Sequence, residues 1–307
     1  MRKRGCRGRL SEAAAAIGGT VKISDILKQD KVTLSFEVFP PKTSDRYESV
    51  SGAAKRIAAL HPDFMSVTYG AGGGTGAFTA NIASEIQDEY GVPTLAHLTC
   101  VSSSKEHVSR MVNIYKEKGI ENILTLRGDI PKDGRVSEDY RYASELIADV
   151  KEQGDFCLGG ACYPEGHIEC VHKRDDIIHL KEKVDAGLDF LTTQMFFDNN
   201  IYYNFLYRIR EKGIMIPVIA GIMPITNAKQ LERSVAMSGT DVPQRFRAIV
   251  DFFGENPDAM RQAGIIYATE QIVDLVANGI RHVHVYTMNK PEVAAAILSN
   301  LSEILKQ

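Results

Sequence analysis

Short apolar runs rich in β-branched residues alternate with longer helical patterns along almost the whole chain of 307 residues. Such runs are typical of buried strands, and their alternation with helices is typical of parallel α/β folds. No Pro/Ser-rich linker, low-complexity tract or change of composition interrupts the alternation, so it predicts one α/β domain. The predicted strands span residues 33–39, 64–69, 94–100, 122–126, 156–161, 190–194, 216–222 and 282–286.

Eight strands separated by helices match the strand number of a closed (β/α)8 TIM barrel. Helical patterns with caps and apolar spacing cover residues 44–60, 103–119, 175–187 and 200–213, and the last three end at a glycine. The segment from about 242 to 278 holds more helix than one crossover needs, which predicts an extra helix before the last strand. An open doubly wound sheet shows the same alternation and remains the alternative.

Composition and charge narrow the class of partner. Hydrophobic residues make up 44% and charged residues 24%, and a net charge of -3 gives no reason to expect nucleic acid or an anionic membrane. The five cysteines are odd in number and form no CxxC pair, which favours a reducing cytoplasm over a disulfide scaffold. Residues 1–22 are basic and lack a signal-peptide core, so we expect a disordered or non-native extension before a catalytic barrel of residues 23–307.

Polar or titratable side chains follow nearly every predicted strand. In a TIM barrel the active site is built at the C-terminal ends of the strands, so these side chains are expected to meet at one rim. Together they supply a carboxylate, an imidazole, a guanidinium, an amide and a phenol, which is more than a structural role predicts. The residues at these positions are Glu37, Thr68, His97, Arg127, Gly128, Asp129, Tyr163, His167, Gln194, Pro224 and Tyr286.

The stretch "LSFEVFPPK" places one carboxylate, Glu37, in an otherwise apolar strand. Burial of an ionised carboxylate without partners is costly, so Glu37 is either paired structurally or active chemically. His97, also in an apolar strand, is by itself more typical of a hydrogen-bonded core histidine. The glycine cluster at residues 70–76 can cradle a phosphate, although such a cluster alone usually forms a turn.

The segment "CYPEGHIECVH" contains four side chains of types that bind zinc, but their spacing fits no common zinc finger. We therefore expect no metal here. We expect instead a loop after a strand, in which Tyr163 and His167 face a ligand. The four side chains are Cys162, His167, Cys170 and His172.

Seven motifs in order carry a family resemblance: "SFEVFPPK", "SVTYGAGGGT", "AHLTC", "LRGD", "YPEGH", "LKEKVDAGLDFLTTQMFFD" and "GIMPITN". From about Ile23 to its end the chain closely resembles the flavin-dependent methylenetetrahydrofolate reductases of bacteria. The resemblance implies a (β/α)8 barrel that holds FAD at its C-terminal rim and acts in one-carbon metabolism and methionine biosynthesis. NADH or NADPH would reduce the flavin, which would then reduce 5,10-methylenetetrahydrofolate to 5-methyltetrahydrofolate. A homo-oligomer is also expected.

The same resemblance assigns roles to single residues. It makes Glu37 the general acid, Asp129 the aspartate that tunes the flavin and contacts the pterin, and Gln194 a pterin ligand. Tyr286 and Lys290 match positions that contact the folate. The expected FAD contacts are Thr68, His97, Arg127, Gly128, Asp129, Tyr142, Ala143, Tyr163, His167, Asp176 and Lys183. Without the resemblance, Lys183 would be interpreted as part of a solvated helix face.

The chain departs from the enterobacterial pattern at two positions. Ala228 stands where that pattern has a phenylalanine that stacks on substrate and nicotinamide. Lys290 stands where that pattern has an arginine, so the positive charge is kept but the planar guanidinium that can bind a folate carboxylate through two hydrogen bonds is lost. Phe196 or Phe197 is the candidate replacement for the missing ring. Otherwise a partner electron-transfer protein, rather than a nicotinamide, would reduce the flavin.

Reduction of the substrate requires that one C–N bond of its methylene bridge opens, which needs a proton on the departing nitrogen. The apolar neighbours of Glu37 in the sequence are expected to favour the protonated carboxyl that such a donor needs. Asp129 would stabilise the resulting cation, and Gln194 would offer a donor and an acceptor to the pterin edge. Two other functions stay open: a flavin-free barrel for folate methyl transfer, and a folate-binding or electron-transfer subunit of a larger complex.

Overall fold

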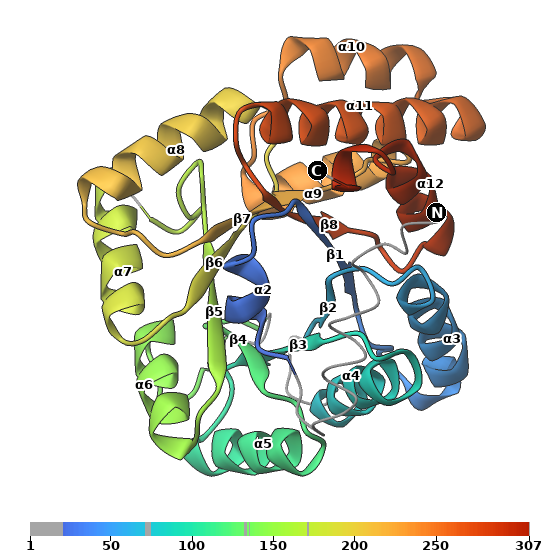
Figure 1. Cartoon of the computed structure of the whole chain (residues 1–307). Coiled ribbons are helices and arrows are strands. Elements are labelled where there is room, and N and C mark those ends of the chain that lie inside the picture. The colour runs from blue at the N-terminus through green and yellow to red at the C-terminus, as the bar shows by residue number, and fades with distance from the viewer. Residues whose placement is uncertain (1–20, 71–74, 132–133, 135, 171, 307) are drawn as a thin grey trace, which may run out of the picture.

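The computed structural model describes residues 21–70, 75–131, 134, 136–170 and 172–306 (Figure 1). Two expectations therefore fall partly outside the described residues. They are the N-terminal extension, of which residues 1–20 are not described, and the glycine cluster, of which residues 71–74 are not described.

The eight predicted strands are confirmed, and they form one closed parallel barrel in chain order. Closure is made by β1 and β8, where Glu37 lies in register with Tyr286, so the open doubly wound sheet is excluded. The observed strands are β1 (Thr33–Val38), β2 (Phe64–Val67), β3 (Thr94–Thr99), β4 (Asn122–Leu126), β5 (Cys157–Cys162), β6 (Phe190–Thr193), β7 (Val218–Ile222) and β8 (His282–Tyr286).

Helices surround the barrel, as the view down its axis shows (Figure 1). The extra helix expected before the last strand is confirmed, because α9, α10 and α11 all lie between β7 and β8. The helices of this outer layer are α3 (Tyr47–Ala58), α4 (Gly76–Tyr90), α5 (Lys105–Glu117), α6 (Ala143–Gln153), α7 (Lys173–Asp185), α8 (Asn199–Glu211), α9 (Ala228–Ser238), α10 (Gln244–Phe253), α11 (Pro257–Ala277) and α12 (Pro291–Asn300). Within the described residues, no helix combines the length and the apolar character that crossing a membrane requires.

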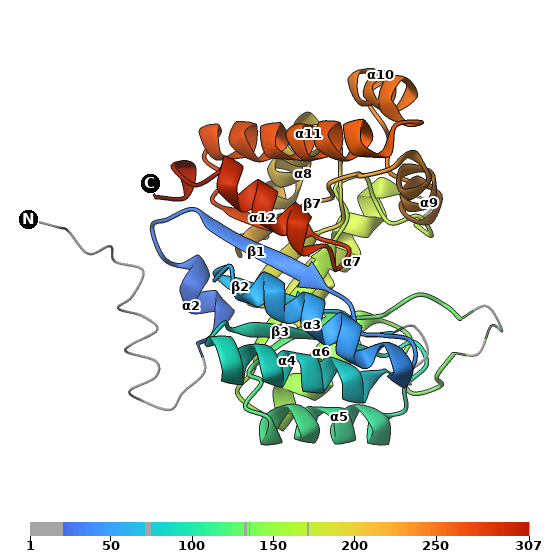
Figure 2. The ribbon, with the colours of Figure 1, turned by 90° about the vertical axis from the view of Figure 1, so that its right-hand side faces the viewer.

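A short helix that the sequence analysis did not predict, α2 (Ile23–Leu27), closes the end of the barrel where the strands begin (Figure 2). Its apolar side chains join a buried cluster at this end, which includes Phe64 and Phe190. The backbone N–H of Ile23 donates to Oδ1 of Asn122 over 2.8 Å, and Asn122 Nδ2 donates to the carbonyl of Val21 over 3.2 Å. Since α2 covers one end, the strand ends with the candidate site residues form the opposite end.

Candidate active site

Glu37 lies at the end of β1 among polar groups from three other strands. Its carboxylate Oε2 accepts a hydrogen bond from Ser66 Oγ at 3.3 Å, and it lies 3.7 Å from Nε2 of His97 and 3.8 Å from Nε2 of His284. The expectation that Glu37 sits among apolar neighbours is therefore wrong. Its neighbours in sequence are apolar, but inward-facing residues of β2, β3 and β8 surround its side chain because alternate residues of a barrel strand point inward.

His97 is buried in β3, and its ring carries an unpaired atom. Among the described residues, Nε2 of His97 is buried and has no hydrogen-bond partner. Burial lowers the pKa of His97 from 6.5 to about 4, against the opposing effect of the nearby Glu37, so the ring is uncharged at neutral pH. A buried polar atom without a partner is costly, so Nε2 of His97 is an unsatisfied position within the candidate site. His97 thus differs from the fully hydrogen-bonded core histidine that its strand alone would favour.

A buried polar network that sequence reasoning missed lies below Glu37. Ser66 Oγ is 3.0 Å from Nε2 of His284, and Ser35 Oγ is 2.7 Å from Nδ1 of the same ring. The exposed fractions of Ser35, Ser66 and His284 are 0%, 0% and 2%. The signal in the sequence was a two-residue period, which puts Ser35 and Glu37 on one face of β1 and His284 and Tyr286 on one face of β8.

The segment after β4 holds an arginine, a glycine and an aspartate in different settings. Nη1 of Arg127 is 2.7 Å from Oε2 of Glu169, and this hydrogen bond raises the pKa of the guanidinium. Gly128 has a φ of 86°, and a Cβ at this position would lie 3.0 Å from Cβ of Thr99. Asp129 is exposed. The ion pair with Glu169 links the loops after β4 and β5, and the sequence analysis did not find it.

The loop after β5 and helix α7 bring four of the expected site residues together. The rings of Tyr163 and His167 meet edge to face, with centroids 4.6 Å apart. Nζ of Lys183 donates to the carbonyl of Ala161 over 2.7 Å, and burial lowers the pKa of this ammonium group. Burial also raises the pKa of Asp176, which Lys183 and His167 partly oppose. The ammonium group of Lys183 therefore packs against β5 and does not lie on a solvated helix face.

Three further residues expected to contact FAD lie directly after β2 and at the start of α6. Thr68 directly follows β2, and its backbone N–H donates to the carbonyl of Val38 over 3.0 Å. Tyr142 and Ala143 lie at the start of α6, where the exposed ring of Tyr142 stacks on His179 with centroids 6.3 Å apart. Their backbone is fixed by Oε2 of Glu145, which accepts from the N–H of Tyr142 over 2.9 Å.

The residues expected to contact the folate are held by short hydrogen bonds. The hydroxyl of Tyr286 donates to the carbonyl of Thr193 at 2.5 Å. Burial, and then the nearby Glu37, hold the pKa of Tyr286 well above its usual value. Nζ of Lys290 donates to Oγ1 of Thr226 over 2.6 Å, while Oε1 of Gln194 accepts from the backbone N–H of its neighbour Met195 over 2.9 Å.

The loop after β8 is tied to the end of β1 at two points, neither of which the sequence analysis found. Oγ1 of Thr287 donates to the carbonyl of Glu37 over 2.6 Å. The side-chain amide of Asn289 accepts from the N–H of Phe39 and donates to its carbonyl, both over 2.9 Å. Met288 and Asn289 both have a φ of 54°, which is uncommon for residues other than glycine and is better tolerated by asparagine.

Neither candidate replacement for the missing aromatic ring is available. Phe196 is 0% exposed and stacks on Tyr202, and Phe197 is 1% exposed and packs on Phe246. The expectation that one of them takes over the stacking role at Ala228 is therefore wrong. Sequence proximity suggested it, but both rings point into the packed core.

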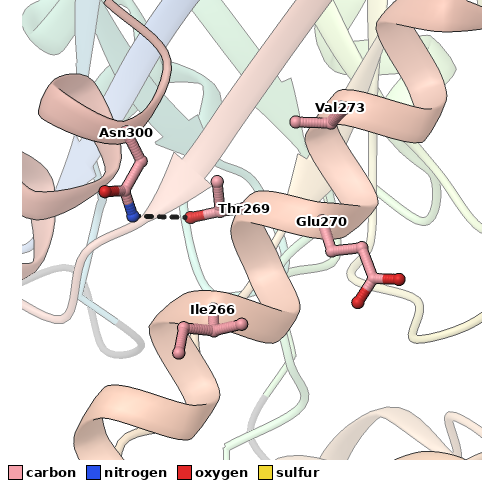
Figure 3. Close-up of a pocket in the computed structure, with 5 residues that line it drawn as sticks. All are labelled: Ile266, Thr269, Glu270, Val273 and Asn300. Atoms are coloured by element: carbon pink, nitrogen blue, oxygen red, sulfur yellow. Dashed lines mark hydrogen bonds between the residues drawn. The ribbon is translucent and has the colours of Figure 1, made fainter.

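A shallow hollow of about 420 Å³ lies on the outer surface between α11 and α12 (Figure 3). It is lined by Ile266, Thr269, Glu270, Val273 and Asn300. The carboxylate of Glu270 already pairs with Arg245 over 2.5 Å. No expected site residue borders the hollow, so the chemistry of this protein is expected at the barrel rim.

Comparisons with known proteins show which family the chain resembles. The family model described as methylenetetrahydrofolate reductase matches residues 22–302. The 5,10-methylenetetrahydrofolate reductase of Pectobacterium carotovorum subsp. carotovorum is 36% identical over 273 residues, which cover 89% of this chain and 91% of that protein. The enzyme of the same name from Escherichia coli (strain K12) is 34% identical over 273 residues, with 89% and 92% covered.

Two further matches extend the comparison. Methylenetetrahydrofolate reductase (NADH) 1 of Arabidopsis thaliana is 35% identical over 298 residues, which cover 92% of this chain but 50% of the plant protein. A solved structure of an uncharacterized Clostridium thermocellum protein, which binds two copies of 5-methyl-5,6,7,8-tetrahydrofolic acid, matches with a TM-score of 0.58. At 16% identity over 92% of this chain and 99% of that one, this match shows a shared fold.

Proposed function

The chain belongs to the methylenetetrahydrofolate reductase family, an oxidoreductase family of folate metabolism, and we propose that it reduces 5,10-methylenetetrahydrofolate to 5-methyltetrahydrofolate with FAD and NADH or NADPH. The observation that carries this proposal is the position of Glu37. A carboxyl group that can donate a proton lies at the barrel rim, 3.7 Å from the unpartnered Nε2 of His97.

The residues at the rim fit an anionic, flat cofactor. Arg127 and Lys183 supply two positive charges for a diphosphate, and the unpartnered Nε2 of His97 offers a polar contact. When bound, FAD would accept a hydride from the nicotinamide and give it to the methylene carbon of the folate. The residues proposed to hold FAD are Thr68, His97, Arg127, Gly128, Asp129, Tyr142, Ala143, Tyr163, His167, Asp176 and Lys183.

For the folate, we propose Asp129, Gln194, Tyr286 and Lys290 as ligands. The hydrogen bond from Met195 fixes the carboxamide of Gln194, and the bond to Thr193 fixes the phenol of Tyr286, so both groups are oriented before a ligand binds. The binding of 5-methyl-5,6,7,8-tetrahydrofolic acid by the Clostridium thermocellum protein of the same fold supports a reduced folate as the ligand.

The proposed role of Glu37 is proton delivery to the bridge nitrogen that leaves the methylene carbon. That C–N bond breaks, its electron pair stays on the nitrogen and takes the proton of Glu37, and the substrate becomes an iminium cation that accepts hydride. Asp129, if ionised beside the pterin, stabilises the positive charge. The uncharged His97 adds no positive charge that would oppose the cation.

One observation favours a second route for the first half of the reaction. Ala228 offers no ring to a nicotinamide, and Phe196 and Phe197 are buried in the core. In this alternative the chain is the folate-binding flavin subunit of a larger complex, and a partner electron-transfer protein reduces its FAD. The alternative leaves the roles of Glu37, Asp129 and Gln194 unchanged.

An anaerobic experiment separates these routes. The purified protein is mixed with NADH or NADPH, the flavin absorbance is followed, and methylenetetrahydrofolate is then added. Direct reduction followed by reoxidation supports the proposal, whereas a flavin that stays oxidised until a partner protein is added supports the second route. Glu37→Gln is expected to keep the first step and abolish the second, and survival of folate reduction in this variant would overturn the assignment of Glu37. A purified protein without a flavin spectrum would favour flavin-free methyl transfer.

A further inference from the structure

A continuous set of hydrogen bonds runs from Glu37 into the barrel interior. Ser66 Oγ lies between Oε2 of Glu37, at 3.3 Å, and Nε2 of His284, at 3.0 Å. On the other side of the ring, Ser35 Oγ lies 2.7 Å from Nδ1 of His284 and 3.2 Å from the carbonyl of Val283. Because the two serines and the histidine are almost completely buried, each of their hydrogens must be directed to a partner within the network.

The number of hydrogens restricts the arrangements. A hydroxyl carries one hydrogen, and a neutral imidazole carries one N–H and one acceptor nitrogen. When Glu37 is ionised, it needs a donor, so the hydroxyl of Ser66 points to Oε2. Nε2–H of His284 must then donate to Ser66 Oγ, and Nδ1 accepts the hydrogen of Ser35.

When Glu37 is protonated, every bond reverses. The carboxyl donates to Ser66 Oγ, the hydroxyl of Ser66 donates to Nε2 of His284, and Nδ1–H donates to Ser35 Oγ. The hydrogen of Ser35 then needs a second acceptor, which is the carbonyl of Val283 at 3.2 Å. All contacts that either arrangement requires are thus present in one set of atomic positions.

We propose that His284 is a positioning residue that changes its tautomer with the protonation state of Glu37 and so keeps the carboxyl group hydrogen-bonded before and after proton delivery. The two serines and the ring hold three hydrogens in both arrangements, so the proton given to the substrate is the one that Glu37 carried. This role in catalysis rests on the proposed function of Glu37. The coupling between the two residues does not.

Among the described residues, two other titratable side chains face the network, His97 and Tyr286, and both are uncharged at neutral pH. His97 of β3 faces Glu37 with a pKa of about 4, and burial keeps the pKa of Tyr286 of β8 well above its usual value. The ring of His284 stacks on Phe64 of β2, with centroids 5.9 Å apart, and its register partner on β7 is Gly221. A change of the His284 tautomer is therefore not caused by a change in the charge of His97 or Tyr286.

The first test reads the tautomer directly in the intact protein. The full chain is labelled with ¹⁵N-histidine, and the signals of His284, identified by their loss in His284→Gln, are followed against pH without folate or nicotinamide. We expect the hydrogen on Nδ1 at low pH and on Nε2 at high pH. In Glu37→Gln, whose amide can donate to Ser66 at every pH, the hydrogen is expected to stay on Nδ1.

Two results would overturn the proposal. One is a single His284 tautomer throughout, and the other is a change of tautomer that persists in Glu37→Gln. Since this measurement requires no turnover, its failure is distinct from a failure of the proposed reaction.

The second test uses two serine variants that should act in opposite directions. Ser35→Ala removes the partner of Nδ1 in both arrangements, but an unpaired buried N–H is less tolerated than an unpaired acceptor, so the change favours the hydrogen on Nε2 and the ionised form of Glu37. Ser66→Ala removes the hydrogen-bond partner of Glu37 in both arrangements, but the loss costs more for the charged carboxylate, which favours the protonated form. The rate of flavin reoxidation by methylenetetrahydrofolate is measured against pH. The midpoint of its decline at high pH should move to lower pH in Ser35→Ala and to higher pH in Ser66→Ala, each by about 0.5–1 pH unit.

A matched control is Ser51→Ala. Ser51 is a buried serine of α3 whose hydroxyl donates to Glu85 over 2.5 Å, outside the network. Its profile should keep the limb of the parent protein. Shifts of Ser35→Ala and Ser66→Ala in the same direction, or no shift in either, would contradict the proposal, because a loss of packing alone gives no opposed pair.

Discussion

Oγ1 of Thr287 donates a hydrogen bond to the backbone carbonyl of Glu37 over 2.6 Å, so the loop after the last strand holds the main chain of the proposed general acid. The side-chain amide of Asn289 makes two hydrogen bonds of 2.9 Å with the backbone of Phe39. The first and last strands are thus linked by side chains beyond the ladder of β1 and β8. The position of Glu37 in the first strand therefore depends on residues that follow the last strand.

The first prediction concerns this link. Thr287→Val keeps the side-chain shape but removes the hydroxyl, and we expect the rate of flavin reoxidation by methylenetetrahydrofolate to fall about five-fold, the equivalent of one hydrogen bond of about 1 kcal/mol. The rate of flavin reduction should stay unchanged. Thr287→Ser keeps the donor and should retain the parent rate in stopped-flow measurements. An equal loss in both half-reactions would argue against a specific effect on Glu37.

The second prediction concerns the half-buried Lys183. Lys183→Met removes the ammonium group but keeps much of the side-chain volume, and FAD affinity should fall about 10-fold to 100-fold because one hydrogen bond to a charged group is lost. Lys181→Met is the control, since Lys181 lies on the same helix and pairs with Asp185 at the surface. Titration of the flavin-free proteins with FAD measures both affinities. Equal affinity in the two variants would remove Lys183 from the cofactor site.

The third prediction concerns the space beside Tyr286. A Cβ at Gly221 would lie 2.4 Å from the carbonyl of Thr193 and 2.6 Å from the hydroxyl of Tyr286, the two groups that bond to each other. Gly221→Ala should therefore lower the free energy of unfolding by about 1–3 kcal/mol. Gly52→Ala adds a Cβ with nothing within 4 Å in helix α3 and should be neutral or slightly stabilising. Urea unfolding compares the two, and equal stability would show that β7 can shift to make room.

The fourth prediction concerns acid stability. The pKa of His97 is 6.5 when unfolded and about 4 when folded, because burial disfavours the cation. Between these values the unfolded chain binds more protons, so the contribution of His97 is complete above about pH 6.5 and is lost as the pH falls to about 4. The full loss corresponds to about 3 kcal/mol.

Comparison of the parent protein with His97→Gln tests this linkage. The free energy of unfolding should fall more steeply from pH 7 to pH 5 in the parent protein than in the variant, whose residue 97 does not titrate. Parallel curves for the two proteins would mean that His97 is protonated in the folded state as well.

Local patterns of the sequence were enough to predict the barrel. The strand at 122–126 and the strand at 282–286 were found with their observed bounds, because short β-branched runs flanked by helical patterns leave little choice of element. The extra helix before β8 was visible because the segment from about 242 to 278, which holds α10 and α11, is too long for one crossover. Helix α2 was missed because five residues carry too weak a periodic signal, and its apolar contacts come from strands far along the chain.

The surroundings of the candidate site residues could not be predicted in the same way. The sequence showed that Glu37, His97 and Tyr286 follow strands, and the closed barrel brings these strand ends to one rim. It did not show that Ser66 and His284 lie against the carboxylate, because contacts between strands depend on register. The burial of Phe196 and the hydrogen bond from Lys183 to the carbonyl of Ala161 also depend on contacts between elements, so they appeared only in the structure.

The docking of α2 also sets an order of events during synthesis. Ile23 is bonded to Asn122, 99 residues further along the chain, and its apolar neighbours include side chains of β5, β6 and β7. This first helix of the described chain therefore leaves the ribosome long before its binding surface exists. The apolar side chains of α2 lack their partners until most strands have been synthesised. The burial of α2 is therefore a late step of folding.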